Sequence, residues 1–282
     1  MKEVISASRR TDLIAFFFGW LSSVFQKKRA RVIGPTNQIY DVDLNPDNVH
    51  TLVLWSKNFS SLLENKEGLL DAVRQYVQAY LHFTITGNGG TPIEPGVPSP
   101  EYAISQLDPL IKLVGSPERI SIRFDPVLFW NEENLPKTNL HFFEKLAPEL
   151  YSRGLQRVHF SFAQWYRKAR IRAERRGFYY YDPPIEEKMK YADYLSEVAA
   201  QNQVQLYVCS QTIFSEITGI RPSACIDGRL LQNLHPEKEP VSTKKDKSQR
   251  KECRCTESID IGSYKQSCPH ACVYCYASVG AI

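Results

Sequence analysis

Short apolar runs rich in β-branched and aromatic residues alternate along the chain with longer segments whose apolar residues recur at helical spacing. The short runs predict strands and the longer segments predict helices. We expect strands at residues 4–7, 51–55, 80–86, 119–124, 157–162 and 204–209. We expect helices at residues 13–26, 60–79, 101–114, 140–152 and 186–201, and a hairpin over 31–44 that turns near 34–37. This alternation favours an α/β fold with a parallel sheet.

Six strand–helix units fit a partial (β/α)6 TIM-like barrel at least as well as an open doubly wound sheet. No predicted strand is followed by a Rossmann glycine turn, because residues 87–90 are too short a match. From residue 236 to 252 apolar residues nearly vanish and basic ones gather. We therefore expect the barrel over 1–235, a basic linker or loop over 236–252 and a cysteine-rich tail over 253–282.

Polar side chains follow several of the predicted strands. In a parallel barrel these strand ends open on one face, which carries the active site. We therefore predict a set of candidate catalytic or substrate-binding residues on that face. They are Arg9, Arg10, Asp12, Lys57, Arg123 and Asp125. A single polar residue at such a place also simply marks where a strand leaves the core.

Arg9 and Arg10 precede an apolar run, as the arginines of a twin-arginine export signal do. Asp12 separates them from the run, basic residues follow it, and no small-residue cleavage pattern is present. We favour a strand followed by a helix capped by Thr11 or Asp12.

Composition adds few constraints. The 282 residues are 43% hydrophobic and 23% charged, which is typical of a globular protein and excludes a disordered or fibrous one. No apolar stretch reaches the ~18 residues of a membrane span. The net charge of +4 permits an anionic partner. Seven cysteines, an odd number crowded toward the C-terminus, indicate metal ligands in a reducing, cytoplasmic compartment rather than disulfides.

Cys268, Cys272 and Cys275 form a C-x3-C-x2-C motif. Three thiolates this close together converge on one metal centre more readily than they pair as disulfides. A cubane iron–sulfur cluster normally takes four protein ligands, so three leave one iron open. The alternative is a zinc knuckle, which would recruit His270 or the Cys253 and Cys255 pair as further ligands.

Four more segments precede this motif in a fixed order. They are residues 6–12 (SASRRTD), 55–58 (WSKN), 123–126 (RFDP) and 260–264 (DIGSY), and the tail motif over 268–277 follows them. Together they resemble a bacterial domain-of-unknown-function family whose C-terminal cysteines are similar to the cluster motif of the radical S-adenosylmethionine superfamily. The resemblance covers nearly the whole chain and brings no substrate with it.

The resemblance implies a [4Fe–4S] cluster on the three tail cysteines and S-adenosylmethionine on the open iron. One electron, from a donor such as a flavodoxin or ferredoxin, would cleave this cofactor and release a 5′-deoxyadenosyl radical. The implied cofactor-binding residues are Thr86, Gly87, Arg123 and Tyr274. The superfamily's cluster loop usually follows the first strand, so here the tail is expected to fold back over the open barrel face.

The remaining cysteines are Cys209, Cys225, Cys253 and Cys255. Four thiolates are a full ligand set for a second iron–sulfur cluster or for a tetrahedral zinc. Free cysteines are also often simply buried in a core, so this alternative stays open.

A basic run over residues 167–176, followed by aromatic residues 178–181, is a further signal. Such a run can bind nucleic acid through phosphates and stacking, but it is more typical of a solvated helix face, so this partner is not favoured. We expect a radical S-adenosylmethionine-type enzyme with an unknown substrate. The alternative is a non-redox barrel with a zinc-binding tail that acts as a hydrolase or a nucleic-acid-binding module.

Overall fold

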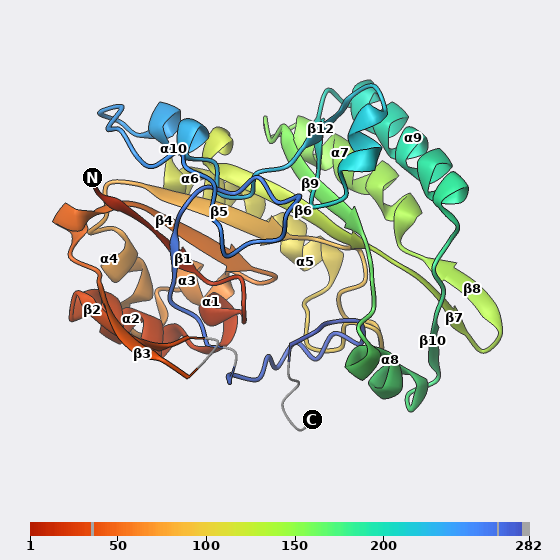
Figure 1. Ribbon diagram of the computed structural model, residues 1–282, viewed down its shortest axis with the longest axis horizontal. Coiled ribbons are helices and arrows are strands. Elements are labelled where there is room, and N and C mark those ends of the chain that lie inside the picture. Colours follow the sequence, from red (N-terminus) through yellow and green to blue (C-terminus); the bar gives the residue numbers. More distant parts are fainter. Residues whose placement is uncertain (35–36, 264, 278–282) are drawn as a thin grey trace.

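The computed structural model describes residues 1–34, 37–263 and 265–277 (Figure 1). Its centre is an eight-stranded sheet in the order β12-β11-β9-β6-β5-β4-β1-β13. All neighbouring strands in it are parallel. The strands are β1 (Glu3–Ala7), β4 (Val49–Ser56), β5 (Ala79–Thr84), β6 (Ile120–Val127), β9 (Arg157–Phe162), β11 (Gln205–Val208), β12 (Ile220–Pro222) and β13 (Ile259–Asp260).

The predicted α/β fold with a parallel sheet is confirmed, and the six predicted strands lie side by side in chain order. The structure adds β12 at one edge and β13 at the other, where Ile259 pairs with Ile5 of β1. Within the described residues these two edge strands do not pair with each other, so the sheet is open and no closed barrel forms.

Helices connect the strands, and those that share the main core cover one face of the sheet. The α-helices are α1 (Leu13–Phe16), α2 (Phe18–Gln26), α3 (Ser60–Leu63), α4 (Leu69–Val73), α5 (Pro100–Ser105), α6 (Leu107–Val114), α7 (Phe143–Tyr151), α8 (Arg167–Glu174), α9 (Ile185–Gln201) and α10 (Gly228–Leu234). Short 3-10 turns are η1 (Pro46–Asn48), η2 (Lys66–Gly68), η3 (Pro117–Arg119), η4 (Leu140–Phe142) and η5 (Thr212–Glu216). Ile5, Leu54 and Leu81 of the strands share the main core with Phe25 of α2 and Leu110 of α6. We call this side the helix-covered face.

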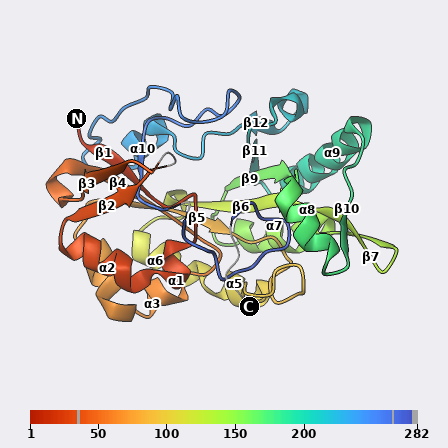
Figure 2. The same cartoon turned by 60° about the horizontal axis from the view of Figure 1, so that its bottom comes forward.

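The opposite side of the sheet is covered mainly by the chain after β12. Because strand side chains alternate between faces, Val4, Trp55 and Tyr80 point away from the main core. They pack with Leu231 of α10 and with Val241 in a second core. Figure 2 shows α10 and the segment after it on one side of the sheet, with α2, α3 and α6 on the other. We call this side the loop-covered face.

Two small sheets lie outside the main one. The predicted hairpin is confirmed as β2 (Arg29–Ile33) and β3 (Ile39–Asp43), although residues 35 and 36 of its turn lie outside the described residues. A three-stranded sheet of β7 (Phe129–Glu132), β8 (Leu135–Thr138) and β10 (Phe178–Tyr180) was not predicted. Trp130 of this sheet belongs to a third apolar cluster together with Val273, so the insertion packs against the tail.

The helix predicted over 13–26 follows β1, and the Asp12 side chain caps it by accepting from the Ala15 amide. Strand followed by capped helix is therefore confirmed, with a break at Phe17 between α1 and α2. The helix predicted over 101–114 is likewise divided into α5 and α6.

The prediction of one continuous helix over 60–79 is wrong. Asn65, Glu67 and Gly68 have positive φ angles of 53°, 49° and 73°, which a right-handed helix does not permit. The segment folds instead as α3, a 3-10 turn and α4. Among the described residues, no helix is both long enough and apolar enough to cross a membrane.

Candidate metal sites at the carboxyl ends of the strands

Asp12 is the point where the ends of β1 and β4 meet the tail. Its carboxylate accepts hydrogen bonds from the Ser56 hydroxyl at 2.9 Å and from the Lys57 backbone amide at 2.9 Å. It also faces Nε2 of His270, a residue of the cysteine motif, at 2.8 Å. A residue predicted as catalytic therefore anchors the tail on the sheet.

His270 is buried and lies between two acceptors. Nε2 faces the Asp12 carboxylate, and Nδ1 lies 2.8 Å from the Gly96 carbonyl. These two contacts fix the orientation of the ring between the Asp12 carboxylate and the Gly96 carbonyl. A Cβ atom on Gly96 would overlap the backbone of Pro269 and His270, so this close approach requires glycine.

A second charge network lies beside the first. Glu94 is fully buried, and its carboxylate accepts from Lys57 Nζ at 2.9 Å, from Thr86 Oγ1 at 2.8 Å and from the Tyr274 hydroxyl. Burial lowers the pKa of Lys57, but attraction to Glu94 and then to Cys272 outweighs burial, so the pKa is raised. The strand-end lysine therefore remains a cation directly beside the tail.

The three tail cysteines are free thiols. Cys272 is only 4% exposed, and burial raises its pKa well above the ordinary value even though the Lys57 charge acts in the opposite direction. Burial and the nearby Asp12 charge raise the pKa of Cys268 to about 11. Charge on Cys268 or Cys275 acts on Cys272, so the three thiols share one environment.

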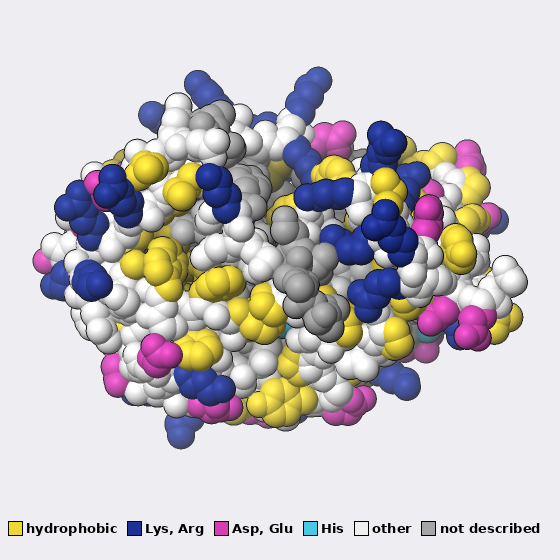
Figure 3. Space-filling model, turned by 90° about the horizontal axis from the view of Figure 1, so that it is seen from below, with side chains coloured by type: hydrophobic (Ala, Val, Ile, Leu, Met, Phe, Trp, Pro, Cys, Tyr) yellow, Lys and Arg dark blue, Asp and Glu magenta, His cyan; other side chains and the backbone are white. Residues whose placement is uncertain are grey.

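Arg172 of α8 holds the backbone of the cysteine loop. Its guanidinium donates to the carbonyl of Cys275 at 2.6 Å and to that of Val273 at 3.3 Å. Arg167, Lys168 and Arg170 of the same helix are exposed. Figure 3, seen from the side on which α8 lies in Figure 1, shows Lys and Arg side chains gathered on this face. The basic run thus contains one structural arginine and several solvated ones.

Arg9 and Arg10 hold the segment that leads to the cysteine loop. Arg9 Nη2 donates to Ser258 Oγ, and Arg10 Nη1 donates to the Gly262 carbonyl, both at 2.7 Å. Asp260 accepts from the Arg9 amide at 3.0 Å, and its carboxylate lies 3.8 Å from the Arg9 guanidinium and 3.7 Å from that of Arg10. Tyr264, the last residue of the same sequence segment, lies outside the described residues.

Arg123 and Asp125 lie apart from the tail cysteines, on the loop-covered face. Arg123 pairs with Asp125 and reaches Cys225 Sγ, which is 3.0 Å from Nη1. Its guanidinium lies 5.3 Å from the Trp55 ring. Asp125 accepts from Ser161 Oγ at 2.5 Å. The structure thus divides the predicted catalytic set between two sites.

The second set of cysteines is assembled on the loop-covered face. Cys225, Cys253 and Cys255 are buried in one cluster, and Cys209 packs against it. All four are free thiols. The arrangement offers four sulfur ligands at a place distinct from the tail cysteines.

The predicted glycine turn has a packing role. Gly87 has a φ angle of +83°, and a Cβ atom there would overlap the Phe142 side chain. Thr86 beside it donates to Glu94, so this turn contributes to the charge network through Thr86.

Sequence reasoning missed Glu94, Gly96 and Arg172. Glu94 and Gly96 lie in the proline-rich loop after β5, where no periodic pattern marks a role. The basic run was noticed, but the pattern could not show that Arg172 points to the tail. The signal that could have been used is the position of the loop directly after a strand end.

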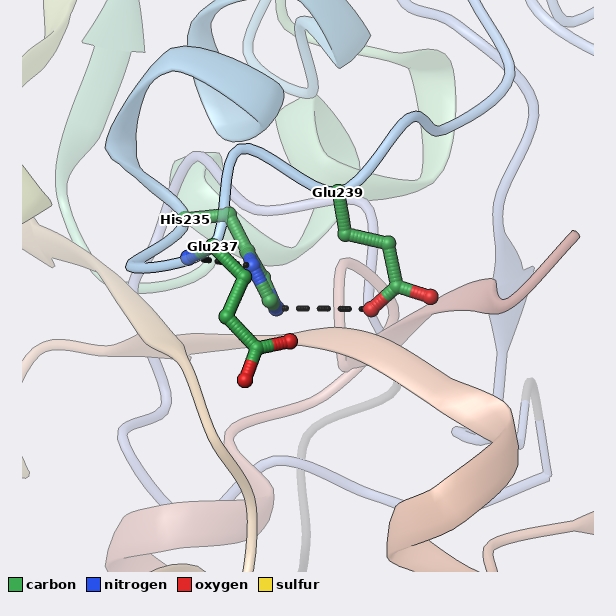
Figure 4. Close-up of side chains that lie close together, drawn as sticks. All are labelled: His235, Glu237 and Glu239. Atoms are coloured by element: carbon green, nitrogen blue, oxygen red, sulfur yellow. Dashed lines mark hydrogen bonds and ion pairs between the residues drawn. The ribbon is translucent and has the colours of Figure 1, made fainter.

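Another group of metal-ligating side chains lies at the amino ends of the strands. One ligand atom each of His235, Glu237 and Glu239 lies within 4.8 Å of the others (Figure 4). Among the described residues, no three cysteine sulfurs lie this close to one another. Glu239 already forms an ion pair with Lys2 at 2.8 Å. A metal ion would have to compete with this ammonium group, so we assign no metal to this group.

Comparison with the curated proteins gives no match. One family model matches residues 4–277, a range that includes the strand ends and both sets of cysteines. Its description states no activity, so the comparison identifies relatives without identifying a reaction. On this match over nearly its whole length, the chain belongs to the family described as domain of unknown function DUF1848.

Proposed function

We propose that the chain is a radical S-adenosylmethionine-type enzyme whose [4Fe–4S] cluster is held by Cys268, Cys272 and Cys275. The observation that carries this proposal is that the tail loop offers three thiols, and not a complete set of four ligands, beside the carboxyl ends of β1 and β4. Three thiolates on a cubane leave one iron free for the cofactor.

The other ligands that a zinc knuckle would recruit are engaged elsewhere. Both ring nitrogens of His270 face oxygen acceptors, one of them on Asp12. Cys253 and Cys255 are buried together with Cys225 in the second set, where the Cys255 amide donates to Cys253 Sγ. A structural zinc site needs four ligands, so this arrangement favours a centre with an open position.

The surroundings of the thiols fit a metal cluster. Thiolates are the ligand form, and burial raises the pKa of Cys268 and Cys272, so the free thiols hold their protons. Metal binding displaces such protons and supplies the positive charge that burial otherwise denies to the thiolates. Lys57 adds a cation that compensates the negative charge of a thiolate-ligated cluster.

When bound, the cluster would transfer one electron from a flavodoxin- or ferredoxin-type donor to the sulfonium of S-adenosylmethionine, which yields methionine and a 5′-deoxyadenosyl radical. The chain's own residues hold the cysteine loop in place for the cluster. Asp12 and His270 fix the start of the loop, Arg172 fixes its end, and Tyr274 is fixed by Glu94.

The proposal also concerns the fold and the compartment of the enzyme. We propose that the open parallel sheet is a partial (β/α) barrel and that the tail covers the ends of its strands. It assigns the protein to the cytoplasm, where thiols stay reduced. The substrate is unknown.

Anaerobic reconstitution with iron and sulfide tests the proposal. We expect the wild type to become brown, to bleach on reduction, and to convert S-adenosylmethionine into methionine and 5′-deoxyadenosine when a reductant is added. Cys272→Ala should abolish cofactor cleavage. Cys225→Ser, a cysteine substitution outside the tail set, is the matched control and should keep the tail cluster.

Two outcomes would contradict the proposal. One is cofactor cleavage that persists in Cys272→Ala. The other is a colourless protein that holds zinc on the tail cysteines and leaves S-adenosylmethionine intact, which would support the zinc-binding alternative.

A further inference from the structure

We propose that Cys209, Cys225, Cys253 and Cys255 bind a second metal centre through four thiolates, on the loop-covered face of the sheet. Neither the family match nor the proposed radical chemistry requires such a centre. The inference depends on how the chain brings these four sulfurs together.

The four cysteines come from separate segments. Cys209 follows β11, Cys225 follows β12, and Cys253 and Cys255 lie in the segment that precedes β13. Cys225 and Cys255 are 8% and 3% exposed. A single buried thiol can be explained by packing alone, but four that meet from three distant segments also form a complete set of sulfur ligands.

The four side chains share one cluster on this face. Cys225, Cys253 and Cys255 are buried in it together, and Cys209 packs against them. Cysteine sulfur is a ligand that both zinc and iron–sulfur clusters use, so the fold gathers one ligand type at one place.

Backbone amides also point at the sulfurs. The Ile226 amide donates to Cys255 Sγ and the Cys255 amide donates to Cys253 Sγ, each at 3.5 Å. Amide-to-sulfur hydrogen bonds of this kind stabilise negative charge on thiolates and orient them toward a metal. A purely apolar packing role would not require them.

The charges around the set complement an anionic centre. Arg123 Nη1 lies 3.0 Å from Cys225 Sγ. Four thiolates carry more negative charge than a divalent zinc or a cubane core neutralises, so nearby guanidinium groups are the expected counter-charges.

Zinc and an iron–sulfur cluster share this ligand chemistry, and the metal content separates them. A centre of either kind would tie the segment around Cys253 to the ends of β11 and β12. That segment leads directly into the Asp260 contacts and then to the tail cysteines. The second centre would therefore support the tail from the loop-covered face.

The test compares metal content across cysteine variants of the full chain. Wild type, Cys225→Ser, Cys255→Ser and Cys275→Ser are reconstituted anaerobically with iron and sulfide, or purified with zinc, and their iron, sulfide and zinc contents are measured. We expect Cys225→Ser and Cys255→Ser each to lose one centre and keep the tail centre. Cys275→Ser, the matched control, should keep the second centre.

Alkylation of the wild-type protein keeps the test valid if a variant fails to fold. In the metal-loaded protein, Cys209, Cys225, Cys253 and Cys255 should resist alkylation, and a chelator should expose all four together. Loss of zinc when these four thiols are exposed identifies a zinc centre, and loss of iron and sulfide identifies a cluster.

The proposal is overturned if metal content is the same in Cys225→Ser and wild type, or if the chelator leaves alkylation of the four thiols unchanged. Because the tail set is assayed separately, failure here leaves the proposed radical chemistry untouched.

Discussion

The two sets of cysteines reach the sheet by different routes. Cys268, Cys272 and Cys275 occupy one short loop, whereas Cys209 and Cys255 of the second set lie on segments separated by β12 and α10. The spacing in the loop is a local property that a sequence pattern can reveal. The second set is assembled only when β11 and β12 pair and the chain returns across the loop-covered face. The tail set can therefore be recognised from the sequence, whereas the second set can be recognised only from the folded structure.

Their surroundings differ in the same sense. The tail set lies beside the buried Lys57–Glu94 ion pair at the strand ends. The second set shares an apolar cluster that includes Trp55, and its nearest charged group is Arg123. Breaking the Lys57–Glu94 pair should therefore affect the tail set and spare the second set, and the predictions below use this difference.

The largest effect is expected for Glu94→Gln. This substitution leaves the Lys57 ammonium, whose side chain is 15% exposed, without its carboxylate partner. Breaking a buried ion pair from one side costs about 3 to 5 kcal/mol. Urea unfolding should show a loss of this size, and the tail cysteines should lose metal before the second set does.

Two further variants sharpen this prediction. Glu118→Gln removes the same charge at an exposed position and should leave the unfolding midpoint unchanged. A double variant with Lys57→Gln and Glu94→Gln should recover part of the loss, because no charge is then left alone. An unchanged midpoint for Glu94→Gln would show that the pair does not hold the tail.

Most of the sheet could be predicted from the sequence because its strands are apolar runs flanked by turn residues, as in β9 (Arg157–Phe162). Prediction failed for elements that are short and form only by pairing with a neighbour. β13 has only two residues and is a strand because it lies beside β1. The break between α3 and α4 depends on positive φ angles at residues such as Glu67, which has no local preference for them.

The candidate site divides in the same way. The tail cysteines were found from spacing, and Asp12 and Lys57 from their position after strands. Glu94 was missed because a lone acidic residue in a loop carries no pattern, and its burial and its contact with Tyr274 of the tail appear only in the folded chain. That Arg123 faces Cys225 and not the tail could not be predicted, since alternation in a strand fixes a side chain's face only once the pairing is known.

An intermediate effect is expected on acidification. At the amino ends of the strands, His50 is fully buried with its ring 4.6 Å from that of His235. Burial lowers the pKa of both below 6.5. The unfolded chain therefore binds more protons below pH 6.5, so the stability contributed by these neutral rings is complete above that pH and lost as the pH falls toward the folded pKa.

Unfolding midpoints in urea between about pH 7.5 and about pH 5 measure this loss. His50→Gln should make the curve less steep, while the buried His82 and His159, whose pKa values are lowered by burial as well, keep their contribution. Tyr40→Phe, at an exposed residue, is the control and should keep the wild-type slope. A wild-type slope in His50→Gln would mean that the acid sensitivity arises elsewhere.

The smallest effect is expected for Arg172→Gln, because this change loosens the cysteine loop without leaving a buried charge alone. The lost contacts are hydrogen bonds to carbonyl groups, the shortest to Cys275 at 2.6 Å. Such bonds contribute about 1 kcal/mol net at a partly exposed position. Global unfolding should shift by about that amount, while a chelator should remove metal from the tail set faster and from the second set at the wild-type rate. Arg167→Gln removes the same charge from an exposed position of α8 and is the matched control. If both variants lose tail metal equally fast, the effect arises from the charge of α8 and not from the hydrogen bonds between Arg172 and the loop.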